Sequence, residues 1–173
     1  FFVRWIYMYN VNDSVLYGKQ GVCKIKDIVT ENFTGKPVEY YTLEPTFSDN
    51  TVIYVPVENE ELVAKMHKIL SAEEIDRLID EVKGTDTIWY DDEKERKAKY
   101  NEIISKGDRK ELLILIHTLY LNKRKRDCDG KKMYVSDERI MKEAEKLIYE
   151  EFAAVLNIKP GQVVEYIVNK MAE

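Results

Sequence analysis

The sequence predicts an α+β protein in which a small antiparallel β-barrel or half-barrel is followed by an all-helical bundle. Short strand-like segments separated by turns occupy the chain up to about residue 67. Beyond that point apolar residues recur at helical spacing between recognisable capping residues. We therefore expect two domains, at residues 1–67 and 68–173, with residues 1–7 forming an extension ahead of the first.

Four segments of the first domain carry residues that are typical of strands. They span residues 13–17, 22–28, 38–44 and 51–57, and the second alternates apolar with charged side chains. Glycine, proline and asparagine residues mark turns between them. This pattern leaves two alternatives open. A closed barrel would have no free edge, whereas a half-barrel would leave an edge strand able to pair with a partner protein.

Capping residues mark the helix boundaries of the second domain. Residues 71–74, Ser-Ala-Glu-Glu, form a capping-box pattern at the start of one helix. Gly107 followed by Asp108 indicates the end of a second helix and the N-cap of a third. We expect Ser136 to cap the fourth helix and Pro160 to lie in the first turn of the last one.

The segment between the first two helices places two aromatic residues, Trp89 and Tyr90, directly before a highly charged stretch. From Glu93 to Lys99 only Ala98 is apolar, although an amphipathic helix normally carries an apolar residue at every third or fourth position. This helix therefore offers little apolar surface to a core in its first half. Trp89 could belong to the core or be displayed on the surface.

Charge is distributed unevenly along the chain. The net charge is −5, which argues against non-specific coating of nucleic acid by the whole protein. Residues 94–132 nevertheless hold thirteen Lys or Arg against six Asp or Glu, a local excess that suits phosphate contacts. Aromatic residues beside such a patch can stack on bases or wedge between them. The alternative is a solvated helical face, and the basic run at residues 123–126 also complements a helix dipole.

Signals of catalysis or metal binding are weak. The two histidines, His67 and His117, and the two cysteines, Cys23 and Cys128, lie at spacings that no metal site uses. The sequence has no glycine-rich phosphate loop and no nucleophile elbow. We expect no cofactor, no metal and no enzymatic activity. No stretch approaches transmembrane length, so we expect a cytoplasmic protein that does not contact a membrane.

Several short motifs follow one another from Met8 onward. Residues 11–17 run Val-Asn-Asp-Ser-Val-Leu-Tyr with Gly21 after them, residues 54–59 run Tyr-Val-Pro-Val-Glu-Asn, and residues 105–108 run Ser-Lys-Gly-Asp. In this order they resemble the "VGDxVVYxxxG" opening, the "VPxEN" strand end and the "SGD", with one residue inserted, of the CarD/CdnL family of bacterial RNA polymerase-binding transcription factors. Their order and spacing make the resemblance fairly specific.

The resemblance implies a Tudor-like first domain that binds the RNA polymerase β subunit, partly by strand pairing. This domain is similar to the polymerase-interacting domain of transcription-repair coupling factor. The resemblance also implies a helical domain that contacts promoter DNA through the phosphate backbone and the minor groove. There a tryptophan wedge favours the open complex. We expect a monomer, associated with the nucleoid through polymerase.

The family's functional residues carry over to two sets of positions. The expected polymerase-binding residues are Thr51, Val52, Ile53, Tyr54, Val55 and Pro56. The expected DNA-binding residues are Trp89, Tyr90, Lys94, Arg96, Lys97, Lys99 and Arg139.

The sequence departs from the family pattern near these positions. Tyr54 and Glu31 stand where one branch of the family carries arginines that are thought to face polymerase. Asp91 and Asp92 follow the tryptophan and would repel phosphate unless they cap the helix. The alternative function is therefore an adaptor that binds polymerase or another partner through a barrel edge, without contacting DNA.

Overall fold

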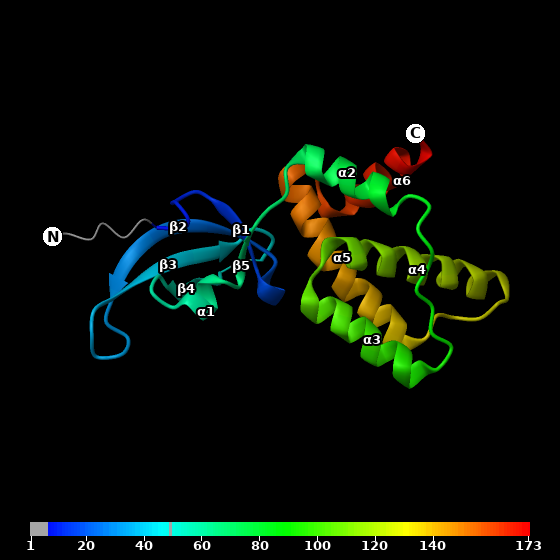
Figure 1. Cartoon of the computed structure of the whole chain (residues 1–173), viewed down its shortest axis with the longest axis horizontal. Coiled ribbons are helices and arrows are strands. Elements are labelled where there is room, and N and C mark those ends of the chain that lie inside the picture. Colours follow the sequence, from blue (N-terminus) through cyan, green and yellow to red (C-terminus); the bar gives the residue numbers. More distant parts are fainter. Residues whose placement is uncertain (1–6, 49) are drawn as a thin grey trace. The chain divides into compact units, whose positions relative to one another are not determined.

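The computed structural model describes residues 7–48 and 50–173 and has the predicted α+β composition (Figure 1). The chain divides into two compact units, one ending at Ile69 and the next beginning at Leu70. Of the expected extension at residues 1–7, only Tyr7 lies within the described part. Its hydroxyl donates a hydrogen bond to Oε1 of Glu39 at 3.0 Å.

The first unit contains a five-stranded antiparallel sheet. Its strands are β1 (Ser14–Tyr17), β2 (Val22–Glu31), β3 (Val38–Pro45), β4 (Ile53–Pro56) and β5 (Met66–Lys68), in the order β4-β3-β2-β1-β5. A closed barrel would require the two edge strands to pair with each other. In the described part of the chain β4 pairs only with β3, and β5 only with β1. The prediction of a closed β-barrel is therefore wrong, because the sheet stays open and keeps two edge strands.

One face of the sheet carries the core of the first unit. Val15, Ile25, Leu43 and Val55 are fully buried there, as their alternation along the strands requires. The register of β2 shifts between Ile25 and Asp27, and such a bulge increases the local twist of the strand. The sequence did not predict β5, the short helix α1 (Glu60–Val63) or the 3-10 turn η1 (Gly18–Gln20), since none spans more than four residues.

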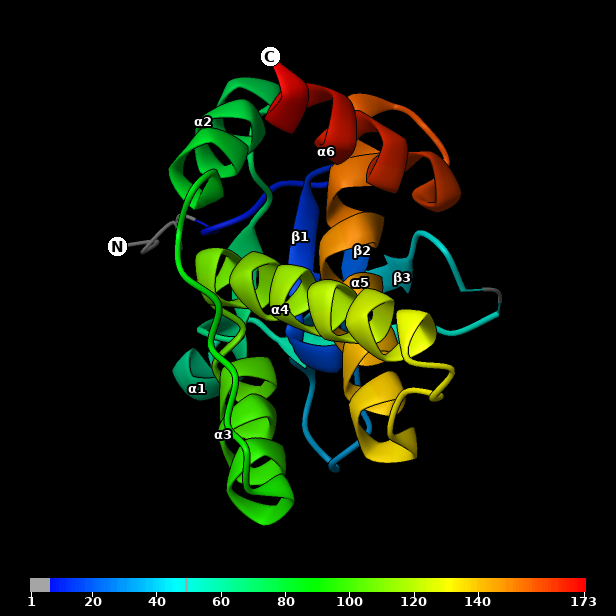
Figure 2. The same cartoon turned by 90° about the vertical axis from the view of Figure 1, so that its right-hand side faces the viewer.

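The second unit is entirely helical. It contains α2 (Ala72–Val82), α3 (Glu93–Lys106), α4 (Arg109–Cys128), α5 (Val135–Leu156), the 3-10 turn η2 (Pro160–Gln162) and α6 (Val163–Ala172). Figures 1 and 2 show α2 beside α6 at one end of this unit and α3 beside α5 at the other. No helix among the described residues is long and apolar enough to cross a membrane.

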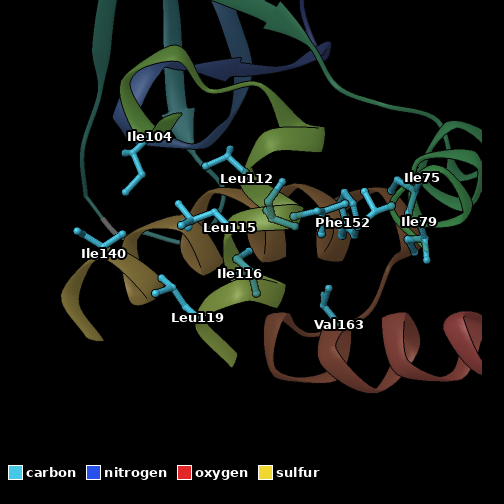
Figure 3. Close-up of a cluster of buried hydrophobic side chains, with 14 of the residues drawn as sticks. Ile75, Ile79, Ile104, Leu112, Leu115, Ile116, Leu119, Ile140, Phe152 and Val163 are labelled. Carbon is cyan, nitrogen blue, oxygen red and sulfur yellow. The ribbon is translucent and has the colours of Figure 1, made fainter. Parts of the chain in front are cut away.

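Apolar residues from all five long helices form a single core in this unit. Figure 3 shows Leu112, Leu115 and Leu119 of α4 lined up between Ile140 and Phe152 of α5, and these side chains are almost completely buried. Burying a large apolar side chain stabilises a fold by about 1.5–3 kcal/mol. This core therefore fixes where the surface residues of each helix emerge.

The predicted caps are confirmed at two helix starts and wrong at a third. Ser71 and Glu74 form the capping box of α2, and Asp108 accepts a hydrogen bond from the Glu111 amide at 2.9 Å. The predicted cap at Ser136 is wrong, because α5 begins one residue earlier, at Val135. Ser136 therefore has helical backbone, whereas an N-cap residue needs an extended one. Its hydroxyl instead donates to Glu93 at 3.4 Å.

Candidate functional sites

The edge strand β4 offers unpaired backbone to a partner. One side of β4 pairs with β3, through Val55 opposite Tyr41 and Ile53 opposite Leu43. On its other side no strand lies within the described residues. Such an edge can accept an added strand through main-chain hydrogen bonds. Of the six residues predicted here, Ile53–Pro56 form β4, whereas Thr51 and Val52 precede it and are exposed.

An exposed aromatic cluster lies beside this edge. Tyr54 is 43% exposed, and its ring centroid lies 5.1 Å from that of Phe33, which is 59% exposed. Both rings also contact Tyr40, at 6.1 and 5.3 Å between centroids. Exposed apolar groups that gather in one patch are typical of protein-binding surfaces. The sequence did not predict Phe33 as a binding residue, because it lies in a turn rather than in a strand. The signal that could have identified it is an aromatic residue among polar ones.

Arg96 is buried, so its guanidinium is not available to DNA phosphate in this structure. The residue is 1% exposed and lies on the same face of α3 as the buried Tyr100 and Ile104. Its Nε donates to both carboxylate oxygens of Asp137, at 3.2 and 3.1 Å, and Nη2 lies 3.1 Å from Oδ2. Asp137 is also 1% exposed. A charge at this depth is tolerated because it is paired and hydrogen-bonded.

Trp89 is half-buried and is held from two sides. The guanidinium carbon of Arg96 lies 4.4 Å from the centre of its ring, within cation–π range. Its indole N–H donates to Oδ1 of Asp91 at 3.1 Å. Asp92 accepts a hydrogen bond from the Glu95 amide at 2.7 Å and so caps α3. Asp91 orients the tryptophan and Asp92 starts the helix, which gives each carboxylate a structural role.

The backbone on either side of Trp89 is also fixed. The Ile88 amide donates to Oγ1 of Thr118 at 3.1 Å, and the Ile88 carbonyl accepts from the Tyr100 hydroxyl at 2.8 Å. Burial raises the pKa of Tyr100, which favours the protonated hydroxyl that donates this bond. The Tyr90 carbonyl accepts from Nη1 of Arg96 at 2.9 Å. These three bonds keep the aromatic side chain in one position without burying it completely.

Arginine and aromatic side chains alternate across this end of the helical unit. The guanidinium carbon of Arg96 lies 4.4 Å from the centre of the Trp89 ring and 5.3 Å from that of Tyr134, and the guanidinium carbon of Arg126 lies 4.0 Å from the centre of the same Tyr134 ring. We call these four residues the arginine–aromatic stack. It joins the starts of α3 and α5 to the end of α4, which meet at one end of the unit (Figure 1).

The other predicted DNA-binding residues lie partly at this same end. Lys94 is exposed in the first turn of α3, and Lys97 and Arg139 are exposed at the start of the second turns of α3 and α5. Tyr90 is half-buried, with its ring 6.0 Å from that of Tyr100. Lys99 is exposed and lies 3.9 Å from Glu102. Among the described residues, no group of three or more His, Cys, Asp or Glu side chains could hold a metal ion.

Comparison with known proteins gives one informative result. Residues 9–70 match the family model described as the CarD-like/TRCF RID domain. The match covers the first unit and stops where the helical unit begins. A search of curated proteins finds no match.

Proposed function

The chain carries a domain of the CarD-like/TRCF RID family at residues 9–70, and from this premise we propose that it is a transcription regulator bridging RNA polymerase and promoter DNA. Domains of this family point to RNA polymerase interaction, and they are protein-interaction domains rather than enzymes. In this proposal the first unit binds the polymerase β subunit. The helical unit contacts the DNA and stabilises the open complex.

The open edge of β4 supports the polymerase contact. Strand addition needs a free edge, and the backbone of Ile53–Pro56 provides one. Tyr54 and Phe33 stand beside this edge and would supply apolar contacts to the added strand. The family match together with this edge is the observation that carries the proposal.

The setting of Trp89 supports a role in DNA contact. Proteins that bend or open DNA often insert an apolar side chain between base steps of the minor groove. A side chain already fixed in orientation loses less conformational entropy when it inserts. Trp89 is held by Arg96 and Asp91 yet remains partly exposed. Lys94, Lys97, Lys99 and Arg139 are exposed cations that we propose as phosphate contacts, and Arg96 instead positions the tryptophan.

A protein of this kind acts by shifting the equilibrium between the closed and the open promoter complex. If it binds the open complex more tightly than the closed one, it stabilises the open complex by that difference, typically about 1–3 kcal/mol. Such a difference extends the lifetime of the open complex by roughly 5- to 150-fold if it appears wholly in the closing step. The lifetime is therefore the quantity to measure.

We predict that Trp89→Ala shortens the lifetime of the open complex formed by purified polymerase, relative to the unaltered protein. Capture of polymerase by the variant should be unchanged, because Trp89 lies in the helical unit and β4 in the first. Trp89→Phe keeps an aromatic ring and should retain part of the effect. Equal lifetimes with the unaltered protein and Trp89→Ala would remove Trp89 from the mechanism.

The second candidate function is an adaptor that binds polymerase without touching DNA. It is favoured by the five carboxylates between residues 86 and 97, which flank Trp89 in the sequence and place negative charge close to it along the chain. Footprinting of the promoter complex distinguishes the two functions. Upstream protection that requires residues 70–173 supports DNA contact, and identical footprints with and without them support the adaptor.

A further inference from the structure

The end of α4 and the turn that follows it concentrate positive charge more than the region around Trp89 does. Residues 123–132, which comprise the last residues of α4 and the start of the turn toward α5 and which we call the basic turn, contain six Lys or Arg and two Asp. Residues 86–97 contain three Lys or Arg against five Asp or Glu, and Arg96 among them is neutralised by Asp137. Attraction of a phosphate backbone follows local charge. The stronger candidate for phosphate contact is therefore the basic turn.

Three lysines of the basic turn differ from Lys99, Lys106 and Lys110 of the same unit in having no carboxylate partner in the described part of the chain. Lys125, Lys131 and Lys132 are exposed, and none forms an ion pair with a described residue. The helix dipole accounts for a cation in the last turn of α4, such as Lys125. It does not account for Lys131 and Lys132, which follow the end of the helix. Elsewhere carboxylates neutralise lysines at 3.9, 2.7 and 3.2 Å, in the pairs Lys99–Glu102, Lys106–Glu111 and Lys110–Glu81.

The backbone of the basic turn is held in a defined conformation. The Lys131 amide donates to the Arg126 carbonyl at 2.8 Å, and Gly130 has a φ of +68°, as in a Schellman motif at a helix end. Nε of Arg126 donates to the Lys132 carbonyl at 2.8 Å, and its guanidinium covers the ring of Tyr134. Lys131 and Lys132 thus project from a fixed turn, which lowers the entropic cost of binding.

We propose that the basic turn binds the phosphate backbone of duplex DNA, with Lys125, Lys131 and Lys132 as the contacts. This inference rests on the proposed function and identifies the part of the helical unit that contacts the phosphates of the duplex. The arginine–aromatic stack links the turn to Trp89 through Arg126 and Tyr134. Phosphate contacts position a protein on DNA, while an aromatic residue enters the groove, and this end of the unit carries both.

The test measures binding of the full chain to a fluorescein-labelled DNA duplex by anisotropy, across a series of salt concentrations. Each phosphate contact contributes about 1 to the slope of log affinity against log salt. Lys131→Gln with Lys132→Gln should weaken binding at low salt and reduce that slope by about 2. The matched control is Lys106→Gln with Lys110→Gln, which removes the same charge from paired lysines of the same unit and should leave the slope unchanged.

Equal losses in the two double variants would overturn the proposal, because net charge rather than location would then govern binding. Absence of salt-dependent duplex binding by the unaltered chain would overturn it as well. So would a loss of polymerase capture by Lys131→Gln with Lys132→Gln, since the turn would then belong to a protein interface. Polymerase capture and open-complex lifetime test the proposed function separately, because neither is read in an assay with free DNA.

Discussion

At the scale of single residues, the Arg96–Asp137 pair determines how the candidate DNA-contacting end is built. Both side chains are 1% exposed, and two atoms of the guanidinium contact the same carboxylate. The remaining faces of the guanidinium meet Trp89 and the Tyr90 carbonyl. One buried ion pair thus connects α3, α5 and the segment before α3, and it also orients the tryptophan.

We predict that Asp137→Asn destabilises the protein by about 3 kcal/mol, because removing one partner leaves a buried charge uncompensated. Urea denaturation followed by circular dichroism measures this change. The control is Glu138→Gln, which alters the neighbouring exposed carboxylate that pairs with Lys142, and it should change stability little. Equal midpoints for the two variants would show that the buried pair does not hold the helices together.

Residue-level rules predicted the features that depend on local chemistry. Ser71, Gly107 and Asp108 have the capping roles expected from the sequence, since capping involves atoms only a few residues apart. The sequence places Arg96 among the phosphate contacts. Its burial could not be predicted, because it depends on Asp137, which lies 41 residues away. A pattern of polar and apolar residues cannot show that a charged residue is paired inside the core.

At the scale of elements, the open edge of β4 is the most informative feature of the first unit. The positions of β1 to β4 could be predicted, but β5 and closure of the sheet could not, because closure depends on pairing between strands far apart in the sequence. The strand predicted at residues 51–57 spans only Ile53–Pro56 in the structure. Phe33 lies in the turn between β2 and β3, and its ring packs against that of Tyr54 on the same surface. The edge and the aromatic cluster together form one candidate docking surface.

We predict that Phe33→Ala with Tyr54→Ala weakens binding to polymerase by about 2 kcal/mol, or roughly thirtyfold in Kd, as expected for aromatic anchors at an interface. Surface-immobilised polymerase and a titration of each variant give the affinity. Val11→Ala removes another exposed apolar side chain, ahead of β1 and away from β4 in the sheet order, and should bind normally. Unchanged affinity of the double variant would exclude the aromatic cluster from the interface.

At the scale of the whole molecule, the two units have separate cores and separate proposed partners. The family match covers only the first unit, so the role of the helical unit rests on its own geometry. That unit is anchored at its first residue. The carboxylate of Glu151, 1% exposed, accepts a hydrogen bond from the Leu70 amide at 3.0 Å and pairs with Arg109 at 2.7 Å.

The last prediction concerns the helical unit on its own. A fragment spanning residues 70–173 should fold cooperatively, because its apolar core, the capping box of α2 and the Glu151–Arg109 pair all lie within it. A fragment starting at residue 72 lacks both the Leu70 amide and the Ser71 cap. It should therefore lose about 2–4 kcal/mol of stability, from one hydrogen bond to a charged group and one helix cap.

Urea denaturation of the two fragments measures that loss, and binding assays then separate the two proposed partners. The longer fragment should bind duplex DNA with the salt dependence of the full chain but fail to capture polymerase, since β4 is absent from it. Equal stability of the two fragments would show that the contacts of Leu70 and Ser71 contribute little. Capture of polymerase by the longer fragment would show that the polymerase-binding surface lies on the helices and not on the sheet.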